Sequence, residues 1–227
     1  RTRPVITIAL IALNAVVFLR QAGLGGGDSE AFVKAFGLVP AAFSWMSVVS
    51  SMFVHAGVLH FAGNMLYLWI FGDNVEDRMG HGRFLAFYLL CGAGAALAQT
   101  AAVPDSLVPM VGASGAIAGV MGAYFVLYPK SRVLTLIPFP ITIVEIPALY
   151  LLGLWFVMQF VNGVATLAPQ AEGQLVGGIA FWAHAAGFGV GVALVFLFRR
   201  PERQRVEWWD DPAAGRCEAR LEQVVLR

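Results

Sequence analysis

Four polar residues lie inside apolar stretches of this 227-residue chain, and their types could support nucleophilic hydrolysis. Ser114 and His184 lie in two different stretches, while His60 and Asn64 lie four residues apart in a third. A serine within reach of an imidazole can act as a nucleophile with its general base. A second imidazole and an amide on one helical face could donate hydrogen bonds to an oxyanion.

Small residues follow both Ser114 and His184 at helical spacing. They are Gly115, Gly119, Gly187 and Gly191. Faces of this kind let two membrane helices approach closely, and packing of these two faces would bring Ser114 within reach of His184. Taken alone, the glycine face after Ser114 indicates only a packing surface whose serine bonds back to its own helix. The matching residues elsewhere in the chain favour the catalytic interpretation.

The composition indicates that membrane helices position these residues. Hydrophobic residues make up 59% of the chain and charged residues 13%, with a mean hydropathy of +0.73. A soluble domain of this length could not bury so much apolar surface. We therefore predict an all-α polytopic membrane protein, with a six-helix membrane domain over residues 1–200 and a charged cytoplasmic tail over 201–227. The predicted spans are 5–19, 48–71, 84–102, 113–128, 143–161 and 178–198.

Three segments outside these spans also carry predictions. Residues 23–46 are rich in aromatic side chains, which suits a segment lying in the membrane interface. Residues 168–178 read as a glycine-rich loop, and residues 218–225 of the tail could form a short helix.

The candidate residues are predicted to share one depth in the membrane. Counted back from the charges that close their spans, Ser114, His184 and His60 lie ~22–24 Å along an ideal helix. In a hydrocarbon layer of about 30 Å, this places all three roughly 6–8 Å below the outer surface. Asn64 lies one turn deeper. Random placement would rarely bring three helices to the same level.

The basic residues predict the orientation in the membrane. Most of them fall on the side that would carry both termini, whereas only Arg20 and Lys34 fall near the other side. Cytoplasmic loops carry the excess of Lys and Arg. We expect an integral protein of a bacterial or archaeal plasma membrane with both termini in the cytoplasm. The net charge of +1 gives no indication of nucleic-acid binding.

Other readings of the polar residues are weaker. No Asp or Glu lies in the outer half of a predicted span, so a Ser–His dyad is expected rather than a triad. His55 and Gly112 are candidate supporting residues, although His55 could equally anchor a loop. His55 and His60 are five residues apart, which does not match the spacing of zinc-binding helices. We expect no metal and no cofactor.

The motifs around these residues resemble those of the rhomboid intramembrane serine proteases. The motifs are Gly112-x-Ser114-Gly115-x-x-x-Gly119, His60-x-x-x-Asn64 and Ala183-His184-Ala185-Ala186-Gly187. Residues 52–55 and 72–76 also match in position and type, and the resemblance extends over residues 5–200. One departure concerns a Trp-Arg pair in the first outer loop of many members, where this chain has Met46 and Ser47. The missing arginine at Ser47 bears on loop anchoring rather than on chemistry.

The resemblance implies a six-helix bundle whose short fourth helix begins below the membrane surface, in a water-filled cavity open to the outside. It implies Ser114 as the nucleophile and His184 as the base. It also implies oxyanion donors at His60, Asn64 and the Ser114 backbone N–H. Substrates would enter past the fifth helix, which carries Trp155, Phe156 and Phe160.

Three functions remain open at this point. The first is an intramembrane endopeptidase acting on single-span transmembrane proteins, in contact with membrane lipid and with no required oligomer. The second is a catalytically silent rhomboid-like protein that binds transmembrane helices, which normally goes with loss of the serine or the histidine. The third is a small-solute channel or transporter that uses the polar cavity. The repeat symmetry or polar path to the inner side expected of a transporter is not apparent in the sequence.

Overall fold

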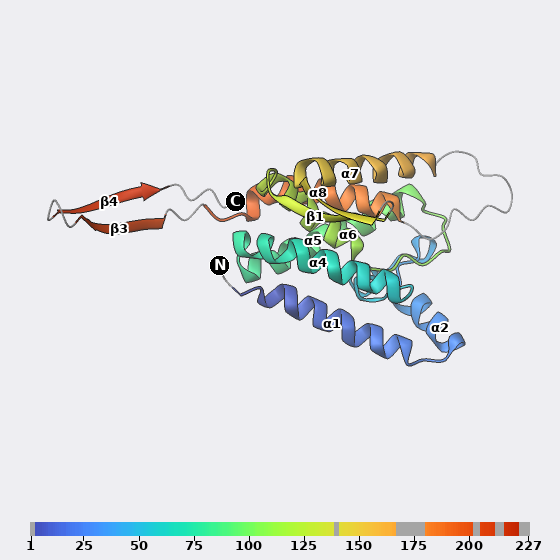
Figure 1. The fold of residues 1–227 in the computed structure, drawn as a ribbon. Helices are drawn as coiled ribbons and strands as arrows, with labels where there is room; N and C mark the ends of the chain where they lie inside the picture. The colour runs from blue at the N-terminus through green and yellow to red at the C-terminus, as the bar shows by residue number, and fades with distance from the viewer. Residues whose placement is uncertain (1–2, 139–140, 167–179, 202–204, 212–215, 223–227) are drawn as a thin grey trace.

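The computed structural model describes the chain apart from residues 1–2, 139–140, 167–179, 202–204, 212–215 and 223–227. The longer helices lie alongside one another in a bundle (Figure 1). They are α1 (Val5–Ala22), α4 (Val58–Met79), α5 (His81–Ala102), α6 (Ser114–Leu127), α7 (Ala148–Ala165) and α8 (Phe181–Phe198). Shorter helices are α2 (Gly26–Phe36), η1 (Pro40–Ala42), α3 (Trp45–Ser50) and η2 (Ser51–Phe53).

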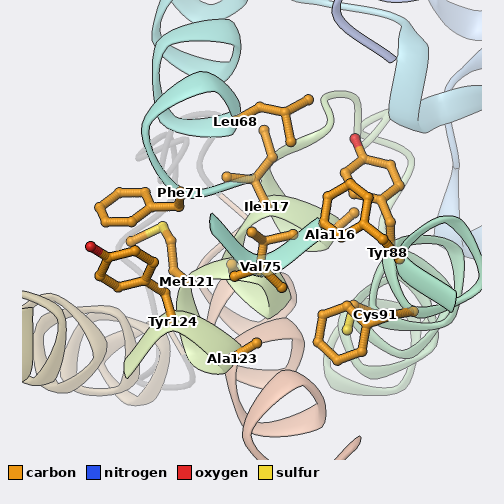
Figure 2. Packing of buried hydrophobic residues seen from close by; sticks show 14 of the residues in the cluster. Leu68, Phe71, Val75, Tyr88, Cys91, Ala116, Ile117, Met121, Ala123 and Tyr124 are labelled. Carbon is orange, nitrogen blue, oxygen red and sulfur yellow. The ribbon is translucent and has the colours of Figure 1, made fainter. Parts of the chain in front are cut away.

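Helix α6 is the centre of the bundle. It packs against α4, α5, α7 and α8, and nine consecutive residues, Ala116–Tyr124, are buried. Figure 2 shows side chains of α4, α5 and α6 converging in the core, among them Phe71, Tyr88 and Met121. A helix that is buried on every side needs an apolar surface all round, and the sequence of α6 provides one.

Four helices of the described residues are long and apolar enough to cross a membrane, and a fifth span results if a bent pair is counted as one. Helix α6 has 14 residues, which correspond to ~21 Å at the helical rise. That length is below the roughly 30 Å of a hydrocarbon core. The chain is therefore a mostly helical integral membrane protein with a short central helix.

The predicted second span is interrupted in the structure. Residues 45–53 and 58–79 form two helical pieces that meet at an angle of 91°. Gly57 precedes α4 in an extended conformation, and the polar residues Ser50, Ser51 and His55 lie at or near the break. Residues 48–71 were predicted to contain the second span, and the structure divides this stretch between α3, η2 and α4. The outer part of the stretch does not continue α4, because it carries polar and helix-ending residues.

The start of the predicted fifth span was wrong. Strands β1 (Arg132–Pro138) and β2 (Ile141–Pro147) form an antiparallel hairpin, and α7 begins only at Ala148. Residues 141–146 are rich in β-branched side chains, which favour strands. Pro147 is then the N-cap residue of α7, where its fixed φ angle is tolerated.

The tail differs from its prediction as well. Strands β3 (Arg205–Asp211) and β4 (Arg216–Glu222) pair in antiparallel fashion where a short helix over 218–225 was expected. The register places Arg205 opposite Glu222 and Glu207 opposite Arg220. Residues 23–46, which were predicted to lie in the membrane interface, contain α2, η1 and the start of α3. The glycine-rich loop 168–178 lies outside the described residues.

A buried carboxylate joins three helices at the end of the bundle opposite Ser114. Glu76 of α4 accepts hydrogen bonds from the backbone N–H groups of Ile6 and Thr7, at 2.8 Å each, and from the Thr7 hydroxyl at 2.7 Å. Its other neighbour is Nδ1 of His81, 2.6 Å away at the start of α5. The carboxylate thus caps the first turn of α1, whose N–H groups have no partner within the helix.

We expect Glu76→Ala to lower the free energy of unfolding by about 2 kcal/mol, because it leaves buried donors of α1 without an acceptor. Glu76→Gln keeps one acceptor oxygen and should lose less. The matched control is Glu30→Ala, which removes an exposed partner of Lys34 on α2 and should change stability little. Denaturation of the purified variants in detergent measures all three. Equal stability of Glu76→Ala and Glu30→Ala would contradict this role of Glu76.

Candidate active site

The structure brings Ser114 and His184 together. Ser114 is the first residue of α6, and His184 lies in the first turn of α8. The Ser114 Oγ is 2.8 Å from His184 Nε2, although the residues are 70 positions apart in the sequence. Hydrogen bonding at this distance lets the imidazole accept the hydroxyl proton, which is the geometry required of a nucleophile and its general base.

Close packing of α6 and α8 makes this contact possible. A Cβ atom added at Gly187 or Gly191 would collide with the carbonyl oxygen of Gly115 or Gly119, respectively. A Cβ at Gly119 would also collide with Cys91 of α5. Gly187 and Gly191 therefore lie directly against the backbone of α6 at Gly115 and Gly119, where only hydrogen fits. A Cβ atom at Gly115 would instead collide with Ala95, so the glycines of α6 also allow close packing with α5.

The other side of the His184 ring contacts α7, which sequence reasoning missed. His184 Nδ1 lies 2.9 Å from Oε1 of Gln159. One helical turn earlier, the ring of Trp155 lies 5.9 Å from the imidazole with an interplanar angle of 34°. A polar residue within a span is unusual, so the position of Gln159 could have marked it as a candidate functional residue. Nothing in the sequence indicated which helix its side chain would contact.

His60 borders the same space as Ser114. The N–H of Ala56 donates to His60 Nδ1 at 3.3 Å, so the ring proton resides on Nε2. A Cβ atom at Gly112 would lie 2.8 Å from that Nε2 and 3.6 Å from Ser114 Oγ. Because residue 112 is glycine, this space is open to both groups. Gly112 has φ +119°, a conformation that favours glycine over any other residue.

Asn64 is placed differently. Its side chain is buried, and its amide nitrogen donates to the carbonyl of His60, one turn earlier in α4, at 2.7 Å. The amide has a second N–H, which is available to donate one more hydrogen bond. The hydrogen bond that the structure shows ties the Asn64 side chain to the backbone of its own helix.

His55 contributes to a junction between α1 and the loop before α4. Its backbone N–H donates to Oε1 of Gln21 at 3.2 Å, and its carbonyl accepts from Nε2 of Gln21 at 2.7 Å. The fully buried ring lies edge-on to the ring of His60, with centroids 5.3 Å apart. His55 thus contacts His60 and helps to fix the position of its ring.

A recess adjoins Ser114 on the side of α5. Its lining is mostly apolar and includes Met52, Gly92, Ala95, Met110 and Ala183. The loop that enters α6 along this recess is held by two backbone contacts. Leu38 and Met110 exchange hydrogen bonds at 2.9 and 2.8 Å, and the N–H of Gly112 donates to the carbonyl of Ser51 at 2.8 Å.

Comparison with known proteins finds several relatives of this chain. The chain is 31% identical over 188 residues to rhomboid protease GluP of Bacillus subtilis, covering 81% of this chain and 35% of that protein. It is 32% identical over 162 residues to rhomboid-like protein 11, chloroplastic, of Arabidopsis thaliana, covering 69% and 54%. With rhomboid protease AarA of Providencia stuartii it shares 26% identity over 212 residues, covering 85% and 72%.

The chain spans about one third to one half of the length of the first two of these relatives. The family model for the rhomboid domain matches residues 42–201. This match contains Ser114, His184, His60 and Asn64 and takes in most of the chain. The resemblance inferred from the three motifs is therefore confirmed, and the chain belongs to the rhomboid family.

Proposed function

We propose that this protein is an intramembrane serine endopeptidase that cleaves single-span transmembrane proteins within or near the outer part of the membrane. The observation that carries the proposal is the 2.8 Å contact between Ser114 Oγ and His184 Nε2. Both residues of the pair are present, which distinguishes the chain from a silent family member that has lost one of them. Two of its relatives carry the word protease in their names.

In the proposed reaction, Ser114 Oγ attacks the scissile carbonyl while His184 Nε2 takes its proton. His184 then gives that proton to the leaving amine, and water hydrolyses the acyl-enzyme with the same base. The oxyanion would accept hydrogen bonds from His60 Nε2–H, from Asn64 and from the backbone N–H of Ser114. The last group belongs to the first turn of α6, where N–H groups have no partner within the helix.

We propose that α1, α3 with α4, α5, α6, α7 and α8 correspond to six membrane segments, with both termini in the cytoplasm. The ends predicted to be cytoplasmic lie together in the structure. Glu76 near the end of α4 contacts the start of α1, and the N–H of Arg200, after α8, donates to the carbonyl of Arg78 at 2.8 Å. The basic residues at this end favour the cytoplasmic side.

The small, apolar recess beside Ser114 supports a substrate with a small side chain next to the scissile bond. The Ser114–His184 pair lies within one chain, so the chemistry requires no oligomer.

The test is a gel assay with a single-span model substrate in liposomes, using the whole chain and, in parallel, Ser114→Ala. We expect the wild type to yield two fragments, cut on the side of the substrate span that faces outward. Absence of cleavage across substrates with small residues in the outer half of the span would overturn the proposal. Binding of the substrate without cleavage would favour the silent rhomboid-like alternative.

The oxyanion assignment makes a separate prediction. We expect His60→Ala and Asn64→Ala each to lower kcat on the order of 10–100-fold, with little change in KM. The loss is smaller than for a sole donor because the backbone N–H and the other side chain remain. Labelling of Ser114 by a fluorophosphonate should slow but persist.

Melting and kcat must be measured on the same preparations, because Asn64 also ties one turn of α4 together. If Asn64→Ala has a lower melting temperature but a normal kcat, Asn64 only stabilises α4 and does not contribute to the oxyanion site. A normal kcat for His60→Ala would remove His60 from the oxyanion site.

A further inference from the structure

We propose that Gln159 is a positioning residue that fixes the tautomer and the orientation of the His184 ring. The inference deepens the proposed function and rests on it. It assigns to α7 a part of the catalytic machinery that lies on neither of the helices carrying the Ser–His pair.

The hydrogen bond itself determines the tautomer. Gln159 Oε1, 2.9 Å from His184 Nδ1, is a carbonyl oxygen and can only accept. Nδ1 must therefore carry the proton, and Nε2 is left with a free lone pair. That lone pair is the one that Ser114 Oγ meets at 2.8 Å. Two hydrogen bonds therefore follow one another: the Ser114 hydroxyl donates to His184 Nε2, and His184 Nδ1–H donates to Gln159 Oε1. In this arrangement Nε2 is free to take the proton of Ser114.

Gln159 works together with Trp155. The two residues are four positions apart on α7 and so share one helical face. The Trp155 ring lies against the imidazole, and it also contacts Phe188 at 6.1 Å between centroids. An aromatic face limits the tilt of the imidazole, and the amide limits its rotation about the Cβ–Cγ bond.

A neutral amide suits this place in a membrane protein. A carboxylate would orient the ring equally well, but a buried charge in the outer half of the bundle is costly. An amide oxygen gives the same direction to the hydrogen bond without that cost. This explains how the base can be oriented although no acidic residue occurs at this depth in the sequence.

A second glutamine provides a matched control. Gln99 on α5 also bonds to the start of α8, but its Oε1 accepts from the backbone N–H of Ala183 at 3.2 Å. Both glutamines therefore anchor the first turn of α8, and only Gln159 reaches the imidazole. Methionine is close to glutamine in length and volume but lacks its strong acceptor, so Gln159→Met and Gln99→Met remove one hydrogen bond each.

We expect Gln159→Met to lower kcat on the order of 10–100-fold, the range seen when partners that orient metal-bound histidines are removed. KM and the melting temperature should change little, and Gln99→Met should keep a kcat near that of the wild type. The readouts are cleavage of the liposome substrate and melting of the same preparations. An equal loss of kcat in both variants would show that anchoring of α8, rather than the ring contact, is responsible and would overturn the proposal.

Nitrogen-15 NMR of histidine-labelled protein tests the tautomer without any activity measurement. His184 is assigned by comparison with His184→Ala. In the wild type its ring should show the proton on Nδ1, and Gln159→Met should lose this preference. A wild-type His184 with its proton on Nε2 would overturn the inference even if the variants fail to fold. The proposed protease function is tested separately from this tautomer. It fails if the wild type cleaves no substrate, whatever the NMR result.

Discussion

Replacement of Ser114 by alanine is expected to reduce cleavage by about 10⁴-fold or more while the protein remains folded. The variant removes the oxygen that would form the acyl-enzyme in the proposed reaction, and it leaves the helix packing unchanged because alanine is slightly smaller than serine. Members of a catalytic unit are strongly non-additive. His184→Ala should therefore be about as inactive as Ser114→Ala, and the double variant should be no worse than either.

The measurement is cleavage of the liposome substrate by wild type and the three variants at matched protein concentration, with melting recorded on each sample. Labelling by a fluorophosphonate gives a second readout, since it should vanish in Ser114→Ala and nearly vanish in His184→Ala. Appreciable turnover by Ser114→Ala would refute the mechanism. Turnover by His184→Ala alone would show that another group takes the proton.

Local patterns were sufficient to predict the family and the helical class. The glycines after Ser114 and after His184 have a spacing that only close helix packing explains, and matching depths could be counted from the flanking charges. Such features are encoded within single helices. The contact between Ser114 and His184 joins two helices, and each of these helices could be predicted from its own sequence.

The features that were not predicted depend on contacts between segments. Gln159 is one polar residue in an apolar helix, and its role becomes visible only when α7 lies against α8. The hairpin of residues 132–147 and the break at 53–58 replace the starts of two predicted spans. In both places apolar composition suggested a membrane helix, whereas β-branched residues, Pro147 and Gly57 set the local backbone. Hydropathy measures the total apolar content of a window and does not register these individual backbone preferences.

The last prediction concerns the contact that holds Ser114 against His184. We expect Gly187→Ala to lower the free energy of unfolding by about 3 kcal/mol, at the upper end of what overpacking typically costs. The added methyl group would collide with the carbonyl oxygen of Gly115, which belongs to a helix backbone and cannot rotate aside as a side chain could. Helices α6 and α8 must then separate, and the Ser114–His184 distance should lengthen with them.

Gly189→Ala is the matched control, because it makes the same change two residues later on α8. A Cβ atom at Gly189 meets nothing within 4 Å, and alanine favours helix by roughly 1 kcal/mol over glycine. This variant should therefore be as stable as the wild type or more so, with normal cleavage. Melting and cleavage measured on both variants separate a general effect of alanine from a specific collision. If Gly187→Ala has the melting temperature of the wild type and cleaves the substrate normally, the close approach of α6 and α8 is not what positions Ser114 against His184.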